Sequence, residues 1–360
     1  MYTRLTLPQS SAEVDFHGQG TAARVEHREV SNHREHLVQI VESFDPRDVE
    51  PGSARRLRLS MVGNGLGGLI TVPVVVLRGQ EQGPTVGITA AIHGNELNGM
   101  RVVQNVIEAV DPRALRGTII AVPVVNVPGY LNNTRHFNDG YDLNRMMPGK
   151  RDGTMSQVYC HRFMSRVVCH LDYLLDLHTA SFGRINTFYV RADLANPVTA
   201  GLARCLNPQI VLHNTGADGT LRGAAQDSGV QSITVEIGNP NRFQDTLIRE
   251  STQGVFNALE HLGLRPTTPP AEPPSTVVCE RSYWMYTQVG GVLEVLPDLG
   301  QHVRKGELVG RVRDIFGDML EEYFAPEDGV IIGRSVHPVN QTGSRIIHLG
   351  IEGEVQAVQA

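Results

Sequence analysis

The hydrophobic pattern of the chain includes two apolar runs on either side of a glycine-rich turn. Leu57–Val62 and Leu69–Leu77 have the aliphatic and β-branched content of strands, and Gly63–Gly68 separates them, which is typical of a β-hairpin. The turn has the GxGxxG spacing of dinucleotide-binding loops, but strand sequence follows it where that motif requires a helix. We therefore interpret the turn as a hairpin loop and not as a nucleotide site.

After the hairpin, apolar runs alternate with amphipathic segments. Helical spacing of apolar residues over 97–110 and 255–262 predicts two helices, and a third is expected to end at Cys169. Buried strands are predicted at Thr85–Ile92, Thr118–Val125, Tyr173–Leu177, Phe188–Arg191 and Ser232–Ile237. Strands that alternate with helices predict an α/β fold whose mostly parallel or mixed sheet carries helices on both faces.

Local composition divides the chain into four segments. Residues 1–55 are polar and irregular and are interpreted as an N-terminal extension, whereas 56–264 carry the α/β pattern. Residues 265–276 contain five prolines, a composition that favours an extended linker. Short strands with Gly and Pro turns over 277–360 predict a small all-β C-terminal domain.

Composition and charge exclude several classes of protein. The chain has 360 residues, of which 41% are hydrophobic, and its net charge of −6 without a basic cluster argues against nucleic acid as a partner. No stretch approaches the roughly 18 to 20 apolar residues of a membrane span, and the first residues lack an export signal. The 4 cysteines are dispersed, as in reduced proteins. We expect a soluble, cytoplasmic protein that binds a small molecule and no membrane; a homo-oligomer is compatible with the sequence.

Candidate metal ligands follow two of the predicted strands. Thr85–Ile92 runs directly into His93 and Glu96, and His178 ends the strand that begins at Tyr173. Ligands of open α/β sheets bind at the carboxyl ends of the strands, and two imidazoles with one carboxylate suit a catalytic Zn²⁺. The HxxE spacing by itself is weak, since about one match is expected by chance, and an isolated His178 is more often a buried structural histidine. The positions of the three residues nevertheless favour one zinc ion per chain.

Other polar residues fit the remaining needs of a metal hydrolase. Glu236 is the one charge in an apolar strand, where it is either a general base or part of a structural ion pair. The loop over 126–149 carries Arg135, Asn144 and Arg145, and guanidinium groups suit a carboxylate or a developing oxyanion. The alternative for each arginine is an ordinary position on the surface.

Five ordered motifs resemble one known family. From Arg56 to its C-terminus, the chain is similar to the succinylglutamate desuccinylase/aspartoacylase family of zinc carboxypeptidase-like proteins. The motifs that carry the resemblance are His93-Gly94-Asn95-Glu96, Thr134-Arg135, Asp142-Leu143-Asn144-Arg145 with Pro148-Gly149, Asp176-Leu177-His178-Thr179, and Val235-Glu236-Ile237-Gly238. Their common order along the chain makes coincidence improbable.

The resemblance implies a role for each candidate residue. It implies zinc ligands at His93, Glu96 and His178, a general base at Glu236, an oxyanion stabiliser at Arg135, and a clamp for the substrate carboxylate at Asn144 and Arg145. Asp142 is then expected to orient a ligand histidine, and Asp176 is a rival for that role. Arg184 and Arg222 rank lower as further clamp residues.

The C-terminal segment resembles the barrel-sandwich hybrid of biotinyl and lipoyl carrier domains. Such carriers are modified on a lysine of an exposed hairpin, but the corresponding stretch Ile315–Leu320 contains none. We therefore interpret the segment as a structural cap or an interface.

These features together predict a zinc-dependent amidohydrolase. We expect it to cleave the amide bond of a small N-acyl amino acid or a related carboxylate-bearing amide, a carbon–nitrogen bond other than a peptide bond. Two alternatives are a zinc carboxypeptidase acting on short peptides and a non-catalytic zinc-binding scaffold. Glu236 argues against the scaffold, because structural zinc sites close their fourth position with protein and leave no carboxylate unused.

Overall fold

The computed structural model describes residues 38–266 and 276–355 of the chain. Residues 1–37 of the predicted N-terminal extension and 267–275 of the predicted linker lie outside the described residues. In the described part, no helix combines the length and the apolar character that a membrane crossing requires.

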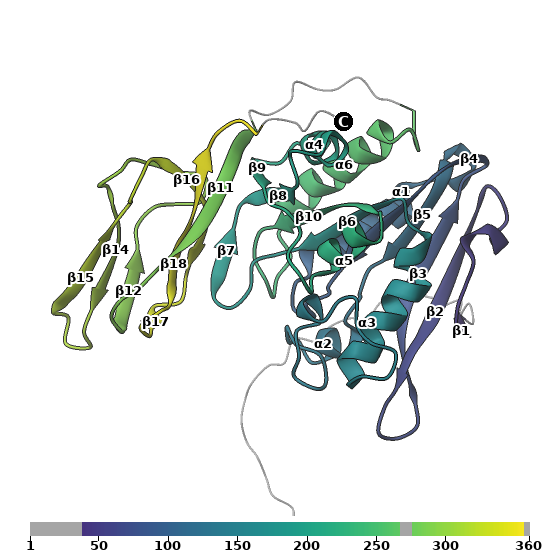
Figure 1. The fold of residues 1–360 in the computed structure, drawn as a ribbon, viewed down its shortest axis with the longest axis horizontal. Helices are drawn as coiled ribbons and strands as arrows, with labels where there is room; N and C mark the ends of the chain where they lie inside the picture. The colour runs from purple at the N-terminus through teal and green to yellow at the C-terminus, as the bar shows by residue number, and fades with distance from the viewer. Residues whose placement is uncertain (1–37, 267–275, 356–360) are drawn as a thin grey trace, which may run out of the picture. The chain divides into compact units, whose positions relative to one another are not determined.

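A mixed sheet of 14 strands forms the framework of the described residues (Figure 1). The strand order is β1-β2-β3-β5-β4-β6-β10-β8-β9-β11-β18-β16-β13, and β7 pairs with β16. The strands are β1 (Gln39–Val41), β2 (Ser53–Gly63), β3 (Leu69–Arg78), β4 (Glu81–Ala90), β5 (Arg116–Val122), β6 (Tyr173–His178), β7 (Arg184–Asn186), β8 (Phe188–Ala192), β9 (Ile210–His213), β10 (Gln231–Ile237), β11 (Val277–Tyr286), β13 (His302–Val303), β16 (Gly329–Ser335) and β18 (Arg345–Glu352). Strands β5, β4, β6 and β10 run parallel, so their carboxyl ends share one edge.

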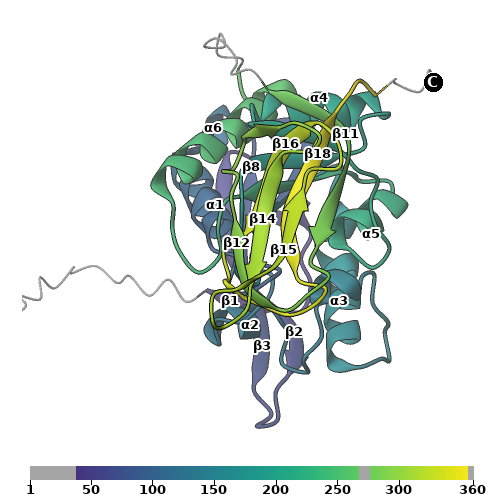
Figure 2. The same ribbon diagram turned by 90° about the vertical axis from the view of Figure 1, so that its left-hand side faces the viewer.

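Helices cover both faces of this sheet. In Figure 2, α1 and α6 lie on one side of it, and α3 and α5 lie on the other. The α-helices are α1 (Asn98–Ala109), α2 (Val127–Leu131), α3 (Met155–Arg166), α4 (Pro197–Cys205), α5 (Leu221–Asp227) and α6 (Asp245–His261), and the 3₁₀ turns are η1 (Pro46–Asp48), η2 (Pro112–Ala114), η3 (Leu143–Arg145) and η4 (Val168–His170). The fold therefore has the layers that the sequence predicts.

Two hydrophobic cores, one on each face, hold the layers together. Successive residues of a strand point to opposite faces, so Val75 and Leu77 of β3 enter the core under α1, α4 and α6, while Val74 and Val76 enter the core under α3 and α5. Burial on both faces explains why these strands are nearly continuous apolar runs in the sequence.

The predicted hairpin is confirmed. The structure also contains several short elements that the sequence did not predict. Strands β2 and β3 pair antiparallel across the glycine-rich turn, so the turn is a hairpin loop as expected. Strands β1, β7 and β9 and helices α2, α4 and α5 were not predicted, because each is too short for a clear period. One of them has a readable start, since α4 begins with Pro197 after the capping residue Asn196.

The C-terminal residues form the β domain (276–355), with a second sheet and a core of its own. The second sheet has the order β15-β14-β12-β17, and its strands are β12 (Gly291–Val295), β14 (Leu308–Arg313), β15 (Met319–Phe324) and β17 (Val339–Asn340). Figure 2 shows β12, β14 and β15 in front of β16 and β18. Leu293, Val309 and Ile346 are among the residues of the hydrophobic core of the β domain. The β domain also continues the large sheet, since β11 pairs in parallel with β9.

Candidate active site

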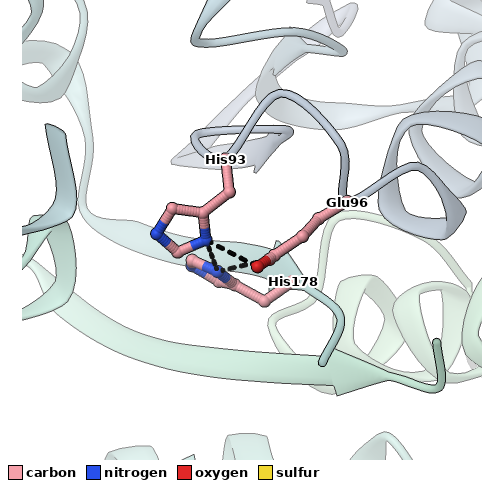
Figure 3. Close-up of side chains that lie close together, drawn as sticks. All are labelled: His93, Glu96 and His178. Atoms are coloured by element: carbon pink, nitrogen blue, oxygen red, sulfur yellow. Dashed lines mark hydrogen bonds and ion pairs between the residues drawn. The ribbon is translucent and has the colours of Figure 1, made fainter. Parts of the chain in front are cut away.

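The three predicted metal ligands meet at the carboxyl ends of β4 and β6. The Nδ1 atoms of His93 and His178 and a carboxylate oxygen of Glu96 lie within 4.8 Å of one another, and all three residues are buried. His93 Nδ1 is 2.8 Å from Glu96 Oε1, and His178 Nδ1 is 3.1 Å from Oε2 and 3.3 Å from His93 Nδ1 (Figure 3). Two imidazole nitrogens and one carboxylate aimed at a common point are the donor set of a catalytic zinc site.

The turn after β4 delivers two of these side chains from one short segment. The chain leaves β4 through Ala91 in a left-handed conformation, with φ of 51°, and the Glu96 amide donates to the His93 carbonyl at 3.1 Å. Glycine is required at position 94, because a Cβ there would collide with the backbone of Gly129 in α2. The glycine of the His-Gly-Asn-Glu motif thus lets the turn pack tightly against the next loop.

Each candidate ligand histidine has its own aspartate. His178 Nε2 is 2.8 Å from Asp176 Oδ2, and His93 Nε2 is 3.2 Å from Asp142 Oδ1, although this second contact lacks the alignment of a hydrogen bond. The sequence left open which aspartate orients a ligand histidine, and the structure gives one to each. Both contacts engage Nε2, which leaves Nδ1 of each ring directed at the cluster.

Charge is strongly coupled within the cluster. Burial disfavours an imidazolium at His178, but Asp176 and Glu96 outweigh it and raise the pKa of His178 well above its usual value. Burial likewise disfavours a carboxylate at Glu96, but His93 and His178 hold its pKa below the usual range. The cluster of His93, Glu96 and His178 therefore stabilises a positive charge between its donor atoms, as the binding of a cation requires.

Arg135 is locked beside the cluster. Its Nη1 donates to Glu96 Oε1 at 3.0 Å and to Ser181 Oγ at 2.8 Å, and its Nε and Nη2 donate to Asp142 Oδ2 at 3.1 and 2.9 Å. Desolvation opposes ionisation of Asp142, but His93 and Arg135 hold the pKa of this carboxyl below its usual range. The guanidinium is thus preorganised beside His93, Glu96 and His178, the candidate metal corner, and Arg135 is not a surface arginine.

Asn144 and Arg145 lie on η3 and line the same pocket. Asp142 caps this turn by accepting from the Asn144 amide at 2.9 Å. The side-chain oxygen of Asn144 accepts from the Leu221 amide at 2.8 Å, which ties η3 to the start of α5. Arg145 is exposed and donates to the Asn144 carbonyl at 2.7 Å, so most of its guanidinium is free for a ligand.

Glu236 stands next to His178 on the neighbouring strand. The two residues are register partners in the parallel pair of β10 and β6, and both line the pocket. Glu236 Oε2 accepts from Asn186 Nδ2 at 3.3 Å, and the nearest cation, Nε of Arg191, is 3.6 Å from Oε1. A contact of this length to Arg191 is looser than a tight structural ion pair, so Glu236 is not locked against a cation.

These side chains line one pocket with a volume of about 470 Å³. Trp284 and Arg345, which the β domain contributes, are among the lining residues that sequence reasoning missed. Trp284 is the only tryptophan in the sequence, but nothing in the sequence around it marks it as part of a site. Of the lower-ranked clamp residues, Arg222 is buried and donates to the carbonyls of Asn214 and Thr215, both at 3.0 Å, a structural arrangement.

Fold and cluster together define an α/β protein with a candidate metal centre at the strand ends. A model of the succinylglutamate desuccinylase/aspartoacylase catalytic domain matches residues 82–262, and the chain belongs to this family. Membership confirms the resemblance seen in the motifs.

Named relatives agree with this assignment. A protein of Halomonas elongata, the N-alpha-acetyl-L-2,4-diaminobutyric acid deacetylase, is 26% identical over 280 residues, which are 74% of this chain and 82% of the relative. The product-bound ectoine utilization protein EutE (DoeB) of Ruegeria pomeroyi has a TM-score of 0.77 at 21% identity, over 84% of this chain and 97% of that one. A succinylglutamate desuccinylase/aspartoacylase structure from Rhodobacter sphaeroides has a TM-score of 0.76 at 23% identity over the same shares, 84% and 97%. The two structures share the fold with this chain.

Proposed function

We propose that the protein is a zinc-dependent hydrolase that removes the acyl group from a small N-acyl amino acid or a related carboxylate-bearing amide. The observation that carries the proposal is the meeting of His93, Glu96 and His178 in one pocket with Glu236 and an arginine clamp. The name of the Halomonas relative, a deacetylase of an N-acetyl amino acid, supports the same reaction type.

His93, Glu96 and His178 would hold the zinc, one ion per chain. A bound zinc supplies Lewis acidity, which polarises a carbonyl oxygen and makes a water molecule more acidic. Asp176 and Asp142 contact Nε2 of the two imidazoles, so that both Nδ1 atoms would be available to hold the ion.

Glu236 and Arg135 have different roles in the chemical step. The carboxylate of Glu236 moves a proton, and the guanidinium of Arg135 stabilises a negative oxygen. Glu236 takes the proton from the attacking water at its carboxylate oxygen and returns it to the leaving nitrogen, so that a free amine and a carboxylate are released. Arg135, already fixed by Asp142, offers its remaining N–H, on Nη2, to the oxygen that becomes negative as the water adds to the carbonyl.

Asn144 and Arg145 would bind the carboxylate of the amino acid. Arg145 can approach a carboxylate with two parallel N–H groups, and the tie between Asn144 and α5 keeps η3 in place. The 4 free cysteines of the described residues fit a reducing compartment, which supports a cytoplasmic enzyme. In this proposal residues 56–264 carry the chemistry, and the β domain is a cap.

The test is an activity screen of the zinc-loaded protein against N-acyl amino acids and short peptides, with chelated protein as the control. We expect hydrolysis of at least one N-acyl amino acid, and loss of that activity on chelation. Cleavage of peptides alone would indicate the carboxypeptidase, and no turnover of either class would indicate a scaffold.

A further inference from the structure

Phe182 is an exposed aromatic side chain in a pocket that is otherwise mostly polar. It lies in the loop between β6 and β7 and lines the pocket that holds the candidate metal ligands. The side chain is 62% exposed, and among the described lining residues it is the one large hydrophobic side chain that is exposed rather than buried or half-buried. An exposed ring in a pocket offers apolar surface that a ligand can remove from water.

The backbone of Phe182 adopts a conformation that bulky residues rarely take. Its φ is 54°, in the left-handed region, and Gly183 follows with a φ of 66°. Glycine adopts such angles freely, but a residue with a Cβ is destabilised there by contacts with its own backbone. Burial of the ring does not offset this cost, because the ring is exposed. Strained residues of this kind cluster at functional sites, so the side chain is better explained by binding than by folding.

The loop that carries Phe182 is anchored on both sides. At the candidate metal corner, the Thr179 amide donates to Glu96 Oε2 at 3.0 Å. At the β domain, the Val336 amide donates to the Gly183 carbonyl at 2.8 Å. These two contacts fix the backbone before and after Phe182, so its ring has a more defined place than an ordinary surface phenylalanine.

The ring lies next to the proposed oxyanion stabiliser. The guanidinium carbons of Arg135 and Arg184 are 5.4 and 5.9 Å from the ring centre, and these contacts leave most of the ring exposed. Arg135 does not depend on the ring for its orientation, because Asp142 accepts from its Nε and Nη2. The oxygen that Arg135 would stabilise is bonded to the carbon that carries the acyl chain. The first carbons of that chain would therefore come within reach of Phe182.

The amino acid half of the substrate is expected to extend toward other elements. Arg145, the proposed clamp for its carboxylate, lies on η3, which Asn144 ties to α5, and α5 packs against β6 and β10. Phe182 instead precedes β7, which pairs with β16 of the β domain. Figure 1 shows β7 beside the β domain and α5 farther from it. The carboxylate clamp and the ring thus belong to different parts of the pocket, and the ring is placed for the acyl half.

We propose that Phe182 is a specificity-determining residue that packs against the acyl chain and selects acyl groups longer and more apolar than acetyl. The inference rests on the proposed function and adds an acyl class to it. Each methylene group that covers the ring should improve binding by about two- to fourfold, since burial of apolar surface is favourable. The substrate would then differ in its acyl group from the N-acetyl compound named for the Halomonas relative.

The first experiment measures binding, which does not depend on turnover. Zinc-loaded full-length protein is titrated with acetate, propionate, butyrate and valerate, which are acids of the kind that the proposed reaction releases. The fluorescence of Trp284, the only tryptophan and a residue of the pocket lining, reports occupation of the pocket. We expect affinity to rise by about two- to fourfold with each methylene group. Affinities that are equal or fall along the series, or no saturable binding of any of the four acids, overturn the inference.

The second experiment assigns the preference to the ring. Phe182→Gly removes the ring and also suits the left-handed backbone, so we expect the gain per methylene group to fall below about 1.5-fold while the thermal midpoint does not decrease. Phe182→Asn, which has a polar side chain that tolerates the same backbone, should lose the preference in the same way. Phe243→Gly is the matched control, since Phe243 is a 49% exposed loop residue that does not line the pocket. It should keep the full preference.

Zinc content is recorded for every variant, so that loss of the metal is not mistaken for loss of the preference. A wild-type preference in Phe182→Gly or in Phe182→Asn would overturn the inference. A parallel titration with L-alanine, L-2-aminobutyrate and L-norvaline tests the assignment to the acyl half. The change of affinity along this amino acid series should be the same in the wild type and in Phe182→Gly. A preference for the longer amino acids that disappears in Phe182→Gly would place the ring at the amino acid half and overturn the inference.

Failure of the proposed function gives a different result from failure of this inference. If the protein is not a deacylase, no N-acyl amino acid is hydrolysed, but the preference among the four acids is still measured. If the protein hydrolyses N-acyl amino acids and shows no preference for the longer acids, only the role of Phe182 is overturned.

Discussion

The two walls of the pocket are built in different ways. His93 and His178 reach the metal corner from the ends of β4 and β6, which pair directly in one sheet. Trp284 and Arg345 reach another wall from the β domain, which is joined to the rest of the large sheet by the pairing of β11 with β9 and of β16 with β7. The comparison teaches that the proposed chemistry is carried by adjacent strands of one sheet, whereas the shape of the other wall depends on how the β domain pairs with that sheet.

The largest effect is expected at the metal corner. His93→Ala and His178→Ala each leave two of three donors, so we expect loss of the zinc that the wild type binds at about one per chain, together with loss of activity. Elemental analysis of the purified proteins measures this directly. His136→Ala is the matched control, because His136 lines the same pocket but is not part of the cluster. Full zinc occupancy in both ligand variants would show that the assignment is wrong.

Glu236→Gln should reduce turnover without removing the metal. The amide keeps the size of the side chain but cannot take a proton, and loss of general-base help costs on the order of 10² to 10⁴ in kcat. Steady-state kinetics and elemental analysis are made on the same preparation. Glu250→Gln, an exposed change on α6, should leave both values at the wild-type level. Near-normal kcat in Glu236→Gln would reject this residue as the base.

Arg145→Ala should act mainly on KM. Arg145 is proposed to hold a carboxylate in the ground state and in the transition state alike, so its loss should raise KM by about tenfold or more and leave kcat nearly unchanged. For a substrate in which the carboxylate is replaced by an amide, Arg145→Ala should hardly change KM. Arg151→Ala, another exposed arginine close along the chain, serves as the control. A fall in kcat at constant KM would assign Arg145 to the chemical step instead.

The smallest effect is expected at the β14–β15 turn of the β domain. Ile315 and Phe316 are 81% and 89% exposed there, and the turn has no lysine that a carrier-type modification could use. Intact mass spectrometry of protein from cells supplied with biotin and lipoate should give the unmodified mass. Phe316→Ser should leave kcat and KM unchanged. A biotinyl or lipoyl adduct would contradict the interpretation of this domain as a cap.

Much of the fold could be predicted because the pattern of buried strands is simple. Strands covered on both faces are apolar runs, and the predicted runs at Thr85–Ile92 and Ser232–Ile237 correspond to β4 and β10. The short elements were missed because segments of 3 to 9 residues show no clear period. Strand β9 at Ile210–His213 is an example, and its significance comes from its pairing with β11 rather than from its own sequence.

The candidate metal ligands could also be predicted from the pattern of buried strands. His93, Glu96 and His178 directly follow or end apolar runs, so their place at one sheet edge follows from parallel pairing alone. The pairing of each aspartate with a ligand histidine depends on the directions of side chains that come from two loops and a strand. The sequence therefore offered Asp142 and Asp176 as rivals, and the structure uses both.

By itself, the sequence determined the layered α/β fold and the residue types that meet at the strand ends, because hydrophobic period and parallel pairing are local rules. The tertiary structure decided the partners of each ligand histidine and the identity of the second pocket wall. Trp284 and Arg345 enter the pocket because β11 pairs with β9 and β16 pairs with β7, and these pairings hold the β domain beside the rest of the large sheet. That placement results from packing between distant segments, which no local pattern encodes.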